Sequence, residues 1–247
     1  MPEHPDTVFA VDIGATSIKF AVVGADGEII GALQRRPTPY PCPPERLVQV
    51  VADRARDSGC TRIGVGFPGE YRDGRVVGSG NLARVGGIGT PVDPVVERAW
   101  EGFALEEALA AATGLAVRVV NDATLAALGC RRGVGREVVL TLGTGLGLAL
   151  IVEGELRPVR DVGAEVRADG RTYDQTLGEQ ARERSEERWR VDLGAIVASF
   201  AAEFGATEVH LAGGNARRVS PLWFEGLGVH VAIHGNDAAL RGAARLF

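Results

Sequence analysis

Two short turns of small residues, far apart in the chain, constrain the fold more than any other feature. The first reads Gly-Ala-Thr-Ser over residues 14–17, between an apolar run from Val8 to Asp12 and a second run that ends at Val23. The second reads Gly-Thr-Gly-Leu-Gly over residues 143–147, again between two apolar runs. Each pattern predicts two antiparallel strands joined by a turn that can cradle an anion. Either turn alone would favour an ordinary hairpin, but their repetition indicates two related units.

The segments between and after these turns have the periodicity of alternating helices and strands. We expect helices at 44–56, 103–113, 123–130, 193–204 and 237–246, and strands at 62–67, 116–120, 208–212 and 228–233. Residues 81–92 are rich in glycine and are expected to be irregular, and residues 179–190 are expected to form a solvated, charged helix face.

The fold class that follows is α/β, with two similar domains facing a cleft. The expected division is a smaller N-terminal domain, residues 1–120 with the C-terminal helix 236–247, and a larger C-terminal domain, residues 121–235.

Composition excludes several classes of function. The chain has 247 residues, of which 45% are hydrophobic, and its net charge is −5. Because it has no basic run and no apolar stretch long enough for a bilayer, nucleic acid and membrane are not expected partners. The three cysteines are isolated, which predicts neither a disulfide framework nor a zinc site. The first residues lack a secretory pattern, so a cytoplasmic location is expected.

The first turn carries side chains suited to a metal-bound phosphate. Gly14 permits close approach of the backbone and a positive φ, and Thr16 adds a hydroxyl donor. Asp12 would repel phosphate, but it can hold Mg²⁺ through water. Lys19 has two open interpretations, a contact to phosphate or a solvent-facing residue of a strand.

Six motifs in order resemble the ROK family of sugar kinases, of the actin and hexokinase type of fold, and within it the compact polyphosphate/ATP glucokinases. They are DIGATSIK at 12–19, GFPG at 66–69, NDATLAALG at 121–129, LTLGTGLG at 140–147, LAGGN at 211–215 and DAALRGAA at 237–244. The resemblance implies two ribonuclease-H-like domains around a cleft, a sugar or sugar-like polyol as substrate, ATP or polyphosphate as donor, Mg²⁺, and a homodimer. Glucose is the default sugar.

The resemblance also assigns roles to single residues. Asp122 would be the general base, although a carboxylate at this position can equally be the N-cap of the next helix. Asn121 and Asn81 would bind sugar hydroxyls, and a turn-forming role is equally open for Asn81. The phosphate and nucleotide would meet residues of four motifs: Asp12, Gly14, Ala15, Thr16 and Lys19; Gly143, Thr144 and Gly145; and Gly213, Gly214 and Asn215. Gly69 belongs to the turn on the sugar side.

The sequence departs from the family pattern in its phosphate, sugar and nucleotide motifs. Ala15 replaces a more usual glycine, which costs little if its φ is negative. The acidic sugar ligand matches Glu165 in one register and Asp161 in another, and neither register supplies the family's histidine. Arg167 follows, either facing an anionic substrate or lying in solvent, the option we favour. Asn215 replaces another glycine, where an asparagine can still adopt a positive φ.

Two functions of different classes therefore remain open. One is a kinase of a sugar or cyclitol. The other is a sugar or nucleotide sensor that has kept the fold and lost the chemistry, which the missing histidine favours and the presence of both Asp12 and Asp122 disfavours. An actin-like filament protein fits the motifs less well.

Overall fold

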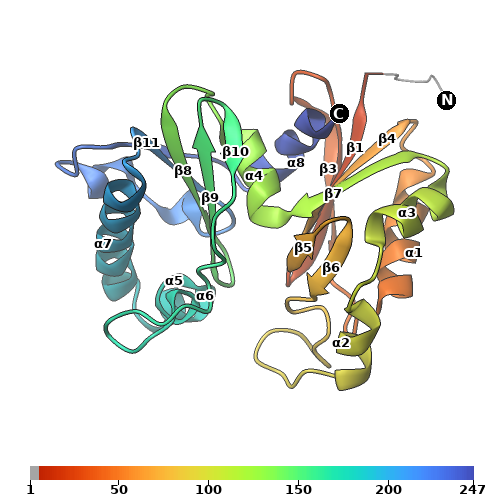
Figure 1. Cartoon of the computed structure of the whole chain (residues 1–247), viewed down its shortest axis with the longest axis horizontal. Helices are drawn as coiled ribbons and strands as arrows, with labels where there is room; N and C mark the ends of the chain where they lie inside the picture. Colours follow the sequence, from red (N-terminus) through yellow and green to blue (C-terminus); the bar gives the residue numbers. More distant parts are fainter. Residues whose placement is uncertain (1–5) are drawn as a thin grey trace. The chain divides into compact units, whose positions relative to one another are not determined.

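The computed structural model describes residues 6–247, which divide into two compact units (Figure 1). One unit comprises Met1–Gly129 and Ala239–Phe247, and the other comprises Cys130–Ala238. The division falls at the last residue of helix α4 (Asp122–Cys130), whereas the sequence had placed it before this helix. The first unit is the longer of the two, although the sequence interpretation had made it the smaller.

The first unit is built on a five-stranded sheet in the order β3-β2-β1-β4-β7. β1 to β3 form an antiparallel meander, and β4 and β7 continue the sheet in parallel with β1. Strand bounds are β1 Val8–Ile13, β2 Ser17–Val23, β3 Ile29–Pro37, β4 Arg62–Phe67 and β7 Ala116–Asn121. The run 62–67 is thus a strand at the predicted bounds. Because β1, β4 and β7 are parallel, their carboxyl ends lie at the same edge of the sheet.

Alternate residues of β1 pack into two different apolar layers, so the sheet is covered on both faces. Phe9, Val11 and Ile13 join a core with α1 (Pro44–Ala55) and α3 (Leu105–Thr113). Val8 and Ala10 join a second core with α4 and α8 (Ala238–Gly242). Gly114, in the left-handed conformation at φ 73, ends α3 as predicted.

A hairpin and a short helix follow β4. The strands β5 (Glu70–Arg72) and β6 (Arg75–Gly78) join through Asp73 and Gly74, both at positive φ. Helix α2 (Pro94–Trp100) is an element that the sequence interpretation missed. Asp93 caps it by accepting hydrogen bonds from the N–H groups of Val95 and Val96, and Pro94 occupies the first turn.

The second unit repeats the same strand order, β10-β9-β8-β11-β12. The bounds are β8 Arg136–Leu142, β9 Leu146–Val152, β10 Glu155–Arg157, β11 Glu208–Ala212 and β12 His230–Ile233. β8 to β10 form the antiparallel meander, and β8, β11 and β12 are parallel. The predicted duplication is therefore confirmed at the level of sheet topology.

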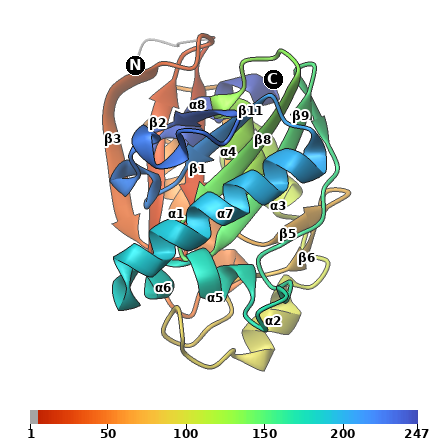
Figure 2. The ribbon, with the colours of Figure 1, turned by 90° about the vertical axis from the view of Figure 1, so that its left-hand side faces the viewer.

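One face of this second sheet packs against α7 (Glu186–Phe204), which lies across β8 in Figure 2. Helix α7 begins seven residues before the predicted start at 193, because Ser185 caps it by accepting from the N–H of Arg188. The other helices are α5 (Tyr173–Leu177) and α6 (Glu179–Arg184), with short 3₁₀ turns at Ala216–Arg218, Pro221–Phe224 and Ala243–Leu246. None of the helices in the described part combines the length and apolar character needed to cross a membrane.

Candidate active site residues

The carboxyl edge of β1, β4 and β7 brings together Asp12 and Asp122, the two acidic residues predicted to act in catalysis. Asp12 is opposite Gly66 in the register of β1 and β4, and Phe67 is opposite Asn121 in the register of β4 and β7. A Cβ on Gly66 would lie 3.4 Å from the Cα of Asp122. Asp12 and the Asn121–Asp122 pair are therefore both neighbours of Gly66, at the edge where α/β sheets bind ligands.

The turn at residues 14–17 is braced through its carbonyl groups. Thr38 donates from its hydroxyl to Gly14 O at 2.6 Å and from its N–H to Thr16 O at 3.2 Å. The Tyr40 hydroxyl donates to Ala15 O at 2.5 Å. Within residues 6–247, the N–H groups of Ala15 and Thr16 donate no hydrogen bond. Two backbone donors are thus left for an anion, which is the arrangement that phosphate-binding turns require.

The backbone of this turn is tighter than the sequence suggested. The positive φ considered for Gly14 is absent, and Ala15 also has a negative φ. What Gly14 supplies is close approach, since a Cβ there would lie 3.0 Å from Ser17 O. Because its φ is negative, Ala15 can stand where the family usually has glycine.

Lys19 lies opposite Asp12 in the antiparallel register and pairs with it, with Nζ 2.6 Å from Asp12 Oδ2. The two side chains are only 12% and 11% exposed. The solvent-facing interpretation of Lys19 is therefore wrong. One oxygen of the carboxylate expected to serve Mg²⁺ is held by an ammonium group.

Asn121, more than Asp122, caps helix α4. Its Oδ1 accepts from the N–H groups of Ala123 and Thr124, and its amide donates to Gly69 O at 3.0 Å. Asp122 Oδ1 also accepts from Ala123 N–H, at 2.8 Å. The cap considered for Asp122 is thus shared, and Asn121 makes the contacts typical of an N-cap residue.

The turn carrying Gly69 crosses a second glycine loop at van der Waals distance. A Cβ on Gly69 would lie 2.1 Å from Gly78 O, and one on Gly80 would lie 2.2 Å from Pro68 O. Asn81 follows this crossing, and its Oδ1 accepts from Arg84 Nε at 2.8 Å. Arg84 also donates to the carbonyl of Thr90, so Asn81 helps to order the loop before α2.

In the second unit, Gly143 O is the anchor of the turn after β8. It accepts from the N–H of Glu179 at 3.0 Å and from Asn215 Nδ2 at 3.2 Å. Asn215 also donates its backbone N–H to Leu142 O at 3.0 Å. The structure therefore brings the predicted segments 143–145 and 213–215 together.

The conformations within 213–215 differ from the prediction. Asn215 is right-handed, with φ −85 and ψ −17, and is 4% exposed, so its suggested positive φ is wrong. Gly213 adopts the left-handed conformation instead, at φ +91, and a Cβ there would lie 2.6 Å from Leu142 O.

Asp174 supports the second turn and was missed by sequence reasoning. Its Oδ1 accepts the N–H of Leu146 at 2.8 Å, and its carboxylate fills the space above Gly145, whose Cβ would lie 2.1 Å from it. Although part of the residue is exposed, burial of the carboxyl group raises its pKa, and Asp161 raises it further against the hydrogen bond from Leu146. The sequence signal nearest to Asp174 is the capping box of Thr172 and Gln175. It predicts where α5 begins but not the contact of Asp174 with the turn.

The two candidate acidic sugar ligands lie in a loop of the second unit with different surroundings. Glu165 pairs with Arg160, Nε to Oε1 2.9 Å, and Arg160 also pairs with Glu203 of α7. The contacts to Glu203 and then Glu165 raise the pKa of Arg160. Asp161 Oδ1 accepts from the N–H of Gly163 at 3.1 Å.

Arg167 is not in solvent, contrary to the option favoured from the sequence. Its guanidinium carbon lies 5.8 Å from the centroid of the Tyr173 ring, and Nη1 lies 3.1 Å from the Thr176 hydroxyl. It also pairs with Asp169 at 3.2 Å. Its role in the described structure is to hold the loop onto α5.

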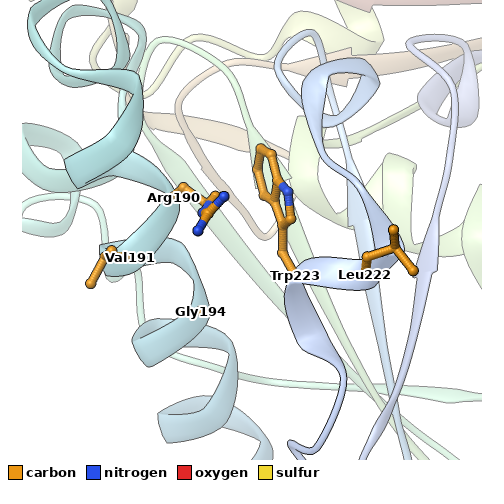
Figure 3. A pocket seen from close by; sticks show the side chains of 5 residues that line it. All are labelled: Arg190, Val191, Gly194, Leu222 and Trp223. Carbon is orange, nitrogen blue, oxygen red and sulfur yellow. The ribbon is translucent and has the colours of Figure 1, made fainter.

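Among residues 6–247, no group of three or more histidine, cysteine or acidic side chains could hold a metal ion. A hollow of about 390 Å³ lies between α7 and the turn Pro221–Phe224 (Figure 3). There Arg190 stands over the Trp223 ring, 5.6 Å from its centroid. The hollow contains none of the predicted site residues.

A family model, described as "ROK family", matches residues 8–160 of the chain. Polyphosphate glucokinase of Mycobacterium leprae is 28% identical over 226 residues, covering 87% of this chain and 65% of that protein, slightly less than two thirds of its length. The polyphosphate glucokinase of Mycobacterium tuberculosis strain H37Rv is 26% identical over 227 residues, covering 87% and 80%.

Among solved structures, the inorganic polyphosphate/ATP-glucomannokinase of Arthrobacter sp. strain KM superposes with a TM-score of 0.79. The two chains are 26% identical, and the match covers 97% of each. The actin and hexokinase type of fold predicted from the motifs is thereby confirmed. Because the family model spans more than half of the chain, this protein belongs to the ROK family.

Proposed function

We propose that the chain transfers a phosphoryl group from ATP or polyphosphate to a hydroxyl of a hexose or a sugar-like polyol. The observation that carries the proposal is the placement of Asp12 and Asp122 around Gly66 at the carboxyl edge of one sheet. Relatives named polyphosphate glucokinase support the type of reaction and the choice of donors.

Asp122 is assigned as the general base. As the sugar oxygen attacks the terminal phosphorus, the O–H proton passes to the Asp122 carboxylate and the bond from phosphorus to the leaving phosphate oxygen breaks. Its position in the first turn of α4 places the carboxylate where the helix N–H groups favour negative charge. Asn121 fixes the backbone of that turn through its cap and its bond to Gly69 O.

Asp12 is the residue that would hold Mg²⁺. Mg²⁺ keeps several waters and uses one or two carboxylates together with substrate phosphates, so a single carboxylate beside a phosphate turn fits it. Since Oδ2 already pairs with Lys19, the contact expected is through water. The ion would supply charge neutralisation for the phosphates.

The donor phosphates are assigned to the two turns. In the first, the N–H groups of Ala15 and Thr16 are the donors. In the second, the exposed Thr144 lies between Gly143, whose carbonyl is anchored, and Gly145, which is packed under Asp174. Gly213 and Gly214 are assigned to the nucleotide when ATP is the donor.

The sugar ligands are assigned to Asn81, Asn121, and either Glu165 or Asp161. Asn81 uses its Oδ1 on Arg84, which leaves its amide N–H groups as donors to a hydroxyl. Glu165 would have to share Arg160 with a sugar, whereas Asp161 uses one oxygen on a backbone N–H and keeps a second acceptor. These contacts favour Asp161 over Glu165, and the missing histidine makes a substrate other than glucose equally reasonable.

The test is a screen of hexoses and cyclitols with Mg²⁺, each offered ATP and polyphosphate in separate reactions. Formation of a phosphorylated product with at least one acceptor is the expected result. The Asp122→Asn protein, purified in the same way, is the control for contaminating kinases.

A non-catalytic sensor is the second candidate, because Glu165 is tied to Arg160 and the histidine is missing. Calorimetry with the same sugars and with ATP separates the two functions. Binding without product in every donor and acceptor combination would favour the sensor and contradict the kinase.

A further inference from the structure

Three titratable side chains form a hydrogen-bonded chain across the sheet of the second unit. Glu137 lies on β8, His210 on β11, and His234 directly after β12. His210 Nε2 lies 2.8 Å from Glu137 Oε2, and His210 Nδ1 lies 2.9 Å from His234 Nε2. The side chains of Glu137 and His210 are 0% exposed. The proposed function gives none of the three a role.

The same carboxylate also holds the point where the chain enters the second unit. The backbone crosses between the units at Gly129/Cys130 and again at Ala238/Ala239. Just after the first crossing, the N–H groups of Arg132 and Gly133 donate to Glu137 at 2.7 and 2.8 Å.

Just before the second crossing, the His234 ring is hydrogen-bonded to His210, which is hydrogen-bonded to Glu137. The backbone N–H of His234 also donates to Leu211 O at 2.8 Å. One buried carboxylate therefore ties both crossings to β8. These are the only two covalent connections between the units.

The hydrogen bonds define how many protons Glu137, His210 and His234 can carry together. Glu137 accepts two backbone N–H groups, so it is an ionised acceptor and His210 Nε2 carries the hydrogen of their bond. The contact between His210 Nδ1 and His234 Nε2 needs a single hydrogen, supplied by either ring. With one ring doubly protonated the contact survives. With both rings doubly protonated, two N–H groups face each other and the contact is lost.

Burial and neighbouring charges influence the pH at which the contact between His210 and His234 is lost. Burial lowers the pKa of His234, as does His210, whereas Glu208 and Asp237 act in the opposite direction. Glu208 Oε1 lies 3.9 Å from His210 Nδ1, and its charge is shared with Arg132 and His230.

Burial would raise the pKa of Glu137, but hydrogen bonds from Arg132, His210 and Gly133 outweigh it and keep that pKa below its usual value. The carboxylate therefore stays charged and remains an acceptor for His210 Nε2.

We propose that Glu137, His210 and His234 form a proton-sensitive clamp that fixes both crossings to the sheet of the second unit, and that acidification releases the crossing at residues 234–238. Histidine is the side chain that titrates nearest to neutral pH, and burial lowers the pKa of His234, so the release requires acidic pH. It acts through protein structure alone and does not depend on the proposed function.

Hydrogen exchange of the unliganded full chain tests the clamp, with protection factors measured for residues 230–238 at about pH 7.5 and about pH 5.5. In the wild type, we expect protection to fall about five- to tenfold at the lower pH, beyond the intrinsic change in exchange rate. His234→Gln keeps a side-chain N–H for His210 Nδ1 but cannot titrate, so its protection should not change with pH. His234→Ala should show low protection at both values.

His230→Gln is the matched control. It removes an imidazole from the same strand, one that is 65% exposed and pairs with Glu208 outside the chain of three, so the wild-type pH response should remain. An equal loss of protection in the wild type and His234→Gln would overturn the clamp, as would unchanged protection in the wild type. Wild-type protection in His234→Ala would also contradict it. Because no substrate is used, failure of this test is separate from failure of the kinase assay.

Discussion

The two turns that begin each sheet share a backbone plan but differ in how the plan is supported. Each lies between the first two strands of a sheet with the same order and the same parallel and antiparallel pairings. In the first unit, the turn at 14–17 is held by side chains donating to its carbonyls, from Thr38 and Tyr40. In the second, the turn at 143–145 is held by Asn215 and by the carboxylate of Asp174.

The strand residues next to the turns differ in charge. Asp12 pairs with Lys19 in the first register, and the corresponding positions of the second register are Thr141 and Gly147. A shared fold thus carries a charged pair in one unit and neutral residues in the other. Under the proposed function, this difference assigns proton and cation chemistry to the first unit and leaves the binding of phosphate in the second unit to its backbone.

The largest expected effect tests this division at the ends of β7 and β12. The sequence Asn-Asp-Ala occurs at the end of β7, residues 121–123, and shortly after β12, residues 236–238. Asp122→Asn should lower kcat by at least roughly 10²-fold, because the amide cannot take the proton of the attacking hydroxyl. Asp237→Asn is the matched variant and should leave kcat at neutral pH within about threefold of wild type.

Steady-state kinetics with the best donor and acceptor measures both variants, and circular dichroism checks that each is folded. Near-normal activity of Asp122→Asn would remove the base assignment. Equal losses in the two variants would erase the distinction between the units.

The next effect concerns packing around the second turn. Gly145→Ala should lower the free energy of unfolding by about 1–3 kcal/mol, because its Cβ would lie 2.1 Å from Asp174 Oδ1. Gly143→Ala, two residues away, should be nearly neutral, since nothing lies within 4 Å of its Cβ. Urea denaturation measures both. Equal stability of the two variants would show that Asp174 moves aside and does not shape the turn.

A smaller effect is expected from the charged pair of the first unit. Asp12→Thr copies the residue of the second unit, and Lys19→Met removes the ammonium while keeping the length of the side chain. The double-mutant cycle should give a coupling energy of about 1–2 kcal/mol, because each single variant leaves a mostly buried partner without its counter-charge. Additive losses of stability would mean that the pair contributes nothing beyond its two side chains.

Local pattern predicted most elements of this fold, and long-range contacts account for what it missed. The short runs 62–67 and 208–212 give β4 and β11 at their observed bounds, and Gly114 ends α3. Helix α2 was missed because the glycine-rich run before it outweighed the signal of Asp93 and Pro94. Lys19 and Asp174 could not be assigned locally: one depends on strand register, and the other on a contact across 28 residues.

The smallest effect, and the one with a defined pH dependence, belongs to Asp174. Burial raises its pKa, so the folded state holds the proton more tightly than the unfolded chain does. Its contribution to stability is therefore fully present below the unfolded pKa and is lost as pH rises through the folded pKa.

Asp174→Asn keeps an acceptor for Leu146 N–H without the charge, so at pH 7 it should melt at the same temperature as wild type or higher, with the difference shrinking as pH falls towards 4. Asp174→Ala loses the acceptor and should be less stable by about 1 kcal/mol. Thermal melts across this pH range check both. A lower melting temperature for Asp174→Asn at pH 7 would mean that the negative charge itself stabilises the second turn. The two units would then differ less in charge around their turns than their strand residues indicate.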